Sequence, residues 1–173
     1  MATKRLTNEQ VVALLGEGPS NIADAARHAS AEQLVTAPAK DEWSANEILA
    51  HMRACADVWG GAIETILAQD RPTIRAMNPR RWIESTEYLD RPFRSSLRAF
   101  AAQRRDLLTL LTSLSSGQWA RRATVTGAGK PLVRSVYDYA EWLATHERPH
   151  VKQIRRAVEA VSGPSSARDR PRI

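Results

Sequence analysis

Histidines are the side chains of this sequence with the clearest chemistry, and there are four: His28, His51, His146 and His150. His146 and His150 are four residues apart in a stretch with helical periodicity, so their imidazoles share one helix face about 6 Å apart along the axis. Such a pair can chelate one divalent ion, and His51 can add a third imidazole from a facing helix. Three neutral imidazoles hold a Zn²⁺-like ion at about 2.0–2.1 Å and leave a position open for water or substrate. His28 has no partner in sequence, and we expect it to be structural or exposed.

The segment 146–150 (HERPH) also matches H-E-x-x-H, a zinc-protease motif. A protease of that class needs a third ligand further along the chain, but no histidine follows His150. It also binds peptide along a strand edge, and no strand pattern is evident. We therefore reject the protease interpretation and keep Glu147 as a candidate general base near bound water. The other interpretation, which we favour, is a solvated acid that pairs with Arg148 or Lys152.

Other reactive or polar side chains fall on the same helix faces. Glu47 lies one turn before His51 and Cys55 one turn after it. Glu47 can complete a helix cap with Ser44 or support the His51 ring, and we favour the cap. Cys55 can be a fourth ligand, a reactive thiol or a small buried residue, and we favour the last. Three aromatic residues near the ligands either wall a pocket or belong to the core: Trp59, Tyr139 and Trp142.

Four stretches have the apolar spacing of amphipathic helices, and none has the alternation of a strand. They are 7–33, 44–69, 90–116 and 132–161. Capping-box sequences predict that the first two begin at Thr7 and Ser44. Residues 16–19 (GEGP) are expected to break the first stretch, and Pro149 is expected to kink the last.

The connection 70–90 is long for a compact domain, which favours a crossover between helices that are not neighbours. A shorter connection, 117–131, includes residues 123–126, which could be briefly extended. Four long helices with one long crossover predict an all-α fold, a four-helix bundle. We expect a single domain over 1–161 and a disordered tail over 162–173.

The composition is that of a soluble globular protein: 173 residues, 43% hydrophobic and 25% charged. We find no transmembrane run and no secretory signal, so we expect a cytoplasmic protein without a membrane partner. A single cysteine excludes an internal disulfide. The net charge of +6 is spread over scattered arginine pairs, and no nucleic-acid partner is expected.

Two segments carry a family resemblance. Residues 43–52 (WSANEILAHM) resemble the W-S-x-x-E-x-x-x-H segment of the DinB/YfiT-like superfamily, and residues 142–154 (WLATHERPHVKQI) resemble its closing H-x-x-x-H-x-x-Q-I segment. The resemblance implies a four-helix bundle with a long crossover. It also implies that His51, His146 and His150 bind Zn²⁺, Ni²⁺ or a similar ion. Pro149 departs from the family pattern.

The resemblance implies two activities on a small-molecule substrate. The favoured one is S-transfer that depends on a low-molecular-weight thiol such as mycothiol, bacillithiol or glutathione, and the alternative is metal-dependent hydrolysis. A third interpretation is a non-enzymatic, stress-related metal-binding bundle that acts as a dimer. A homodimer is expected from the family.

Overall fold

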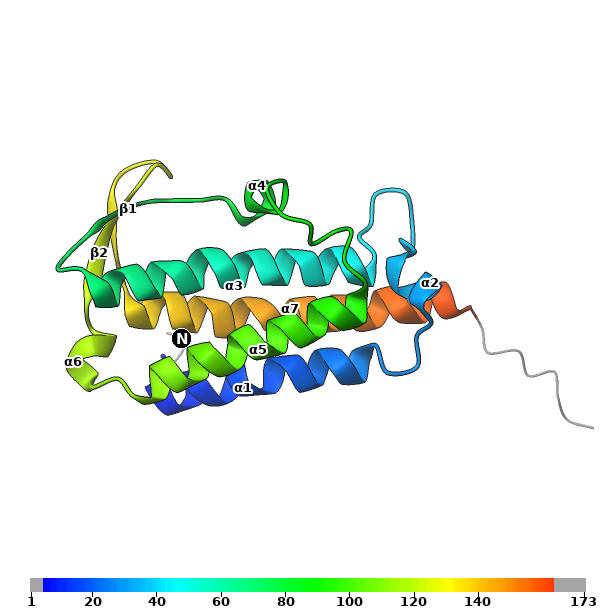
Figure 1. Ribbon diagram of the computed structural model, residues 1–173, viewed down its shortest axis with the longest axis horizontal. Coiled ribbons are helices and arrows are strands. Elements are labelled where there is room, and N and C mark those ends of the chain that lie inside the picture. The colour runs from blue at the N-terminus through cyan, green and yellow to red at the C-terminus, as the bar shows by residue number, and fades with distance from the viewer. Residues whose placement is uncertain (1–4, 164–173) are drawn as a thin grey trace, which may run out of the picture.

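Four long helices make up the body of the molecule, whose computed structural model describes residues 5–163. They are α1 (Asn8–Ala25), α3 (Ala45–Ala68), α5 (Phe93–Thr112) and α7 (Val136–Ser162). Helix α3 packs against α7 and α5, and α1 also packs against α7 and α5, so the four form a closed ring (Figure 1). The predicted all-α four-helix bundle is confirmed.

Side-chain caps determine where the helices begin. Ser44 accepts from the Glu47 amide while the Glu47 carboxylate accepts from the Ser44 amide, which confirms the predicted capping box at the start of α3. Thr7 and Ser135 cap α1 and α7 in the same way. The predicted start of the last helix at 132 is wrong, because residues 132–135 form a strand that leads into the Ser135 cap.

The predicted break at residues 16–19 is also wrong, because α1 continues through Pro19. A proline in a helix leaves the carbonyl four residues earlier without its amide partner. Here that carbonyl belongs to Leu15, and it accepts a hydrogen bond from Arg104 Nη1 at 3.1 Å. A tertiary contact therefore offsets the local cost of the proline. The chain instead turns at 26–30 and enters the short helix α2 (Ala31–Val35).

A small sheet closes one end of the bundle. It consists of β1 (Thr73–Arg75), β2 (Arg122–Thr126) and β3 (Leu132–Ser135), with β1 parallel and β3 antiparallel to β2. The extended segment predicted at 123–126 is confirmed as part of β2, but the expectation of no strands is wrong. Strands this short offer little alternation to detect, and their pairing joins segments far apart in sequence.

The crossover between α3 and α5 contains β1 and the short helix α4 (Pro79–Ile83), and it lies along α3 (Figure 1). Asp57 of α3 holds it. Its carboxylate accepts from Trp82 Nε1 at 2.9 Å, from the Tyr88 hydroxyl at 2.5 Å and from Gln103 Nε2 at 2.7 Å. The bonds from Trp82 of α4 and from Tyr88 hold the crossover against α3, and the bond from Gln103 joins Asp57 to α5.

None of the helices between residues 5 and 163 combines the length and hydropathy needed to span a membrane. Near the C-terminus, Ser162, the first residue of the predicted tail, still belongs to α7. Residues 164–173 lie outside the described part, so the disordered tail stays a prediction.

Candidate metal centre

The three histidines expected to bind metal lie where α3 and α7 pack against each other. His51 lies in the second turn of α3, and His146 and His150 lie one turn apart on α7. The ring centroids are 5.3 Å apart for His51 and His146, 4.9 Å for His51 and His150, and 4.5 Å for His146 and His150. The structure thus brings the three imidazoles into one cluster.

Two of the imidazoles point their Nε2 atoms at each other. These atoms of His146 and His150 are 3.2 Å apart. His150 Nδ1 lies 3.0 Å from Gln153 Oε1, which assigns the proton to Nδ1 and leaves Nε2 as an electron-pair donor. The Nδ1 atom of His146 is buried without a hydrogen-bond partner among the described residues. Such convergent nitrogen donors with unmet bonding capacity fit a divalent cation.

Burial keeps these imidazoles uncharged. It lowers the pKa of His51 and His146 to about 4, and the neighbouring imidazoles add to the effect. Burial also lowers the pKa of His150, and Arg80 disfavours a further positive charge on His150 and on His51. At neutral pH the rings are therefore in the form that binds metal.

A model of the DinB superfamily matches residues 14–154. The chain belongs to the DinB superfamily. It also resembles the solved structure of YfiT from Bacillus subtilis, described as a probable metal-dependent hydrolase with an unusual four-helix bundle topology, with a TM-score of 0.74 over 94% of this chain and 93% of that chain. The identity is 17%, so this likeness shows the fold alone. No curated protein matches the chain.

Pro149 does not interrupt α7 of this DinB chain. The carbonyl that loses its helical partner there is that of Thr145, an exposed residue, so water can satisfy it. His150 still lies against His146. That His51, His146 and His150 hold a metal ion stays a prediction, and their arrangement suits it.

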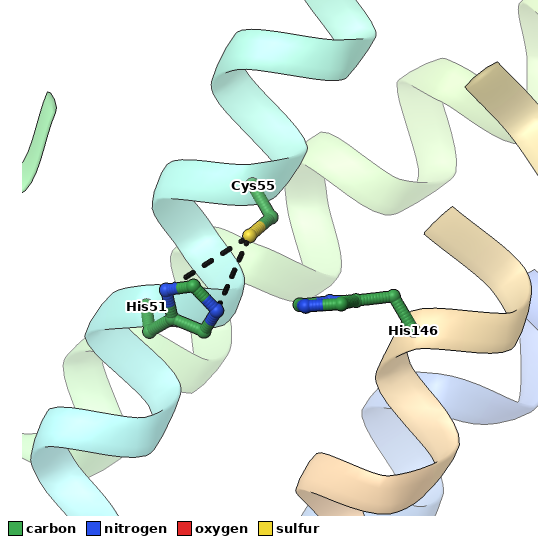
Figure 2. Close-up of side chains that lie close together, drawn as sticks. All are labelled: His51, Cys55 and His146. Carbon is green, nitrogen blue, oxygen red and sulfur yellow. Dashed lines mark hydrogen bonds between the residues drawn. The ribbon is translucent and has the colours of Figure 1, made fainter. Parts of the chain in front are cut away.

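Cys55 lies beside the histidines, as Figure 2 shows. Its Sγ is 3.5 Å from His51 Nε2, and the donor atoms of His51, Cys55 and His146 all lie within 4.8 Å of one another. The side chain is buried, as the favoured sequence interpretation predicts, and burial raises the pKa of the thiol to about 12. An uncoordinated Cys55 is therefore protonated and a poor nucleophile.

Glu147 is not a solvated acid paired with Arg148 or Lys152, and that expectation is wrong. It is 3% exposed, and both carboxylate oxygens accept from the guanidinium of Arg104 on α5. The pair joins α7 to α5 across the bundle, beside the Leu15 carbonyl of α1, whereas the imidazoles face α3. The general-base role stays a prediction, and the geometry favours a structural role.

A cleft of about 690 Å³ with charged residues in its wall opens beside His150. His150 and Gln153 form part of its wall, and Arg80 and Arg156 bring positive charge to it. No ion pair between described side chains involves either arginine. Sequence reasoning missed Arg80 because it comes from the crossover, whose position over α3 no local pattern reveals.

Aromatic rings form the other boundary of the site. Trp43 lies 5.3 Å from the His51 ring, and the Arg80 guanidinium lies 5.1 Å from the Trp43 ring. Trp59 meets His146 edge-on at 5.0 Å and stacks on Trp142 at 4.2 Å. Beyond Trp59 is an apolar cavity of about 400 Å³, which the predicted aromatic wall lines: Trp59, Tyr139 and Trp142. His28, by contrast, is exposed and far from these elements in sequence.

Proposed function

We propose that this DinB protein is a metal-dependent enzyme that transfers a low-molecular-weight thiol to a small electrophile. One observation carries the proposal: three uncharged imidazoles, His51 buried and His146 and His150 half-buried, converge next to a cleft that His150 lines and that carries charges of both signs. Arg80 and Arg156 supply the positive charges, and Asp41 and Glu42 supply the negative ones. Low-molecular-weight thiols are polar molecules rich in carboxylate, amino and hydroxyl groups, and such a cleft suits them.

His51, His146 and His150 would hold the ion. A divalent cation there supplies Lewis acidity, which lowers the pKa of a thiol or a water that reaches it. Side chains of the protein orient the ligands and bind the substrate. Gln153 orients the His150 ring through Nδ1, and Arg80 and Arg156 can bind a carboxylate of the substrate and orient it. In the reaction the thiol sulfur forms a bond to carbon, the leaving group departs with its bonding pair, and the thiol proton passes to solvent.

Hydrolysis is the second candidate. It is supported by the description of YfiT as a probable metal-dependent hydrolase, and by the fact that Lewis acidity that activates a thiol also activates water. The same cleft would then take an ester or amide that carries an anionic group. The non-enzymatic, stress-related dimer is the third reading, and it requires that the site bind metal without turnover.

The deciding experiment uses tag-free protein loaded with Zn²⁺ or Ni²⁺. A chlorinated aromatic electrophile is offered with glutathione, mycothiol or bacillithiol, and chromogenic esters are offered without thiol. We expect turnover that requires a thiol and disappears in the His146→Ala variant. Ester cleavage without thiol would replace the transferase by the hydrolase, and no turnover with either metal would leave the non-enzymatic reading.

The cleft has a matched pair of variants. Arg156→Gln removes a cation from the cleft wall, whereas Arg155→Gln removes the adjacent exposed cation, which lies outside it. We expect only Arg156→Gln to raise the KM for the thiol, with little change in kcat. Equal effects of the two variants would remove Arg156 from the binding site.

A homodimer remains a proposal from the family resemblance, and a cytoplasmic location remains a proposal from the sequence. Light scattering after gel filtration, at several protein concentrations, tests the first.

A further inference from the structure

Cys55 occupies a place where a further metal donor could lie. It follows His51 by one turn of α3, so both side chains leave the helix on the same face. Its side chain is 1% exposed, and its Sγ lies next to the His51 nitrogen that faces His146 (Figure 2). The cysteine therefore belongs to a cluster of metal-binding side chains rather than standing alone.

Two distances among these three residues and the adjacent His150 match the edges of a tetrahedral site. Bond lengths of about 2.05 Å to nitrogen and about 2.3 Å to sulfur give a nitrogen–sulfur edge of about 3.6 Å and a nitrogen–nitrogen edge of about 3.4 Å. The observed separations are 3.5 Å between Cys55 Sγ and His51 Nε2, and 3.2 Å between the Nε2 atoms of His146 and His150. One edge lies on α3 and the other on α7. Across the two helices, the donor atoms of His51, Cys55 and His146 all lie within 4.8 Å of one another.

We propose that Cys55 Sγ is a fourth protein donor to the ion held by His51, His146 and His150, an inference that rests on the metal site of the proposed function. Cys55 binds as a thiolate and its proton passes to solvent. Three imidazoles and one thiolate supply the number of donors that a tetrahedral site takes. A substrate must then enter as a fifth ligand or displace Cys55, so this residue controls access to the ion.

The rival arrangement is a hydrogen bond in which the Cys55 thiol donates to His51 Nε2. Its sulfur–nitrogen distance would be similar, but that nitrogen would not be free to bind metal. The two arrangements differ in whether sulfur contacts the ion. A thiolate donor also favours soft cations, so Cys55 ligation should raise the preference for Co²⁺ and Zn²⁺ over Mn²⁺.

Cobalt substitution tests the contact directly. The chain contains one cysteine, so an intense near-ultraviolet thiolate-to-cobalt absorption band in thiol-free buffer can come only from Cys55. We expect this band in the Co²⁺-loaded wild type and its loss in Cys55→Ser and Cys55→Ala, with one ion per chain by elemental analysis in all three proteins. The two variants should also lose part of the preference for Co²⁺ over Mn²⁺.

The possible outcomes distinguish failure of Cys55 as a ligand from failure of the three-histidine site. Stoichiometric Co²⁺ without the band in wild type overturns the role of Cys55 and leaves the three-histidine site standing. No bound Co²⁺, Zn²⁺ or Ni²⁺ in wild type overturns the site itself. The wild-type spectrum decides the question even if a variant does not fold, and Cys55→Ser keeps a hydroxyl that can still donate to His51.

Discussion

Replacing Glu147 by glutamine should strongly destabilise the protein without emptying the metal centre. Arg104 is 2% exposed and is held by the Glu147 carboxylate and the Leu15 carbonyl that Pro19 leaves free. The substitution keeps the side-chain shape but removes the charge, so the guanidinium remains buried without a counter-ion. Breaking such a pair costs about 3–5 kcal/mol. For a chain of this size each kcal/mol lowers Tm by about 2–4 °C, so we expect a drop of about 6–20 °C.

Thermal unfolding of the metal-free protein, followed by circular dichroism, measures this effect. Glu159→Gln is the matched control, because Glu159 is an exposed acid of the same helix. Its effect should stay within about 0.5 kcal/mol. Replacing both partners by apolar residues, as in Arg104→Met with Glu147→Leu, should recover most of the lost stability because no buried charge remains.

Equal Tm values for Glu147→Gln and Glu159→Gln would refute the reasoning, because they would mean that the pair is not buried in solution. The same variant also tests the general-base hypothesis. Below its Tm it should keep one ion per chain and lose far less activity than His146→Ala. A folded, metal-loaded Glu147→Gln protein as inactive as His146→Ala would make Glu147 the catalytic base.

Three other changes test the metal centre and the crossover above it. His51→Ala and His146→Ala should each abolish tight Zn²⁺ binding by elemental analysis after gel filtration, and an ion retained in either variant contradicts the three-histidine site. Asp57→Asn should lower the free energy of unfolding by about 1.5–3 kcal/mol or more, because it weakens charge-assisted hydrogen bonds. It should also speed amide hydrogen exchange in residues 82–88. Unchanged exchange in these residues would mean that Asp57 does not hold the crossover. Because burial lowers the pKa of His51 and His146 from 6.5 to about 4, the unfolded chain takes up protons before the folded one as the pH falls through this window. Denaturant titrations of metal-free protein should therefore show stability falling from pH 6.5 to 4, with a shallower fall in His146→Ala.

Local signals predicted the parts of the site that are encoded within single helices. Ser44 and Glu47 mark the start of α3 through a bond between neighbours, and this start places His51 in the second turn. The i, i+4 spacing of His146 and His150 is enough to put both rings on one face, and they do lie together. Such features depend on helix geometry alone, and a sequence displays them directly.

Local sequence signals did not predict the features that depend on contacts between helices and strands. Pro19 predicts a break because its cost is local, whereas the Arg104 side chain that offsets it comes from α5. Strand β1 exists because it pairs with β2, about fifty residues later in the chain, as the pairing of Ile74 with Val125 illustrates. Arg80 reaches the site only because Asp57 holds the crossover in place. Each of these three features depends on contacts that exist only in the packed bundle, so no local sequence pattern predicts it.

Residues 146–150 can be interpreted as a zinc-protease motif or as a pair of candidate ligands around a structural acid. The two interpretations differ in what Glu147 contacts. Successive helical residues point about 100° apart, so His146 and Glu147 necessarily face different neighbours of α7. In this bundle His146 faces α3 and the candidate metal centre, and Glu147 faces Arg104, which α5 extends toward α1. The buried pair therefore opposes rotation of α7 about its own axis. It holds His146 and His150 toward His51, so the same five residues that resemble a protease motif orient two candidate ligands and anchor the helix that carries them.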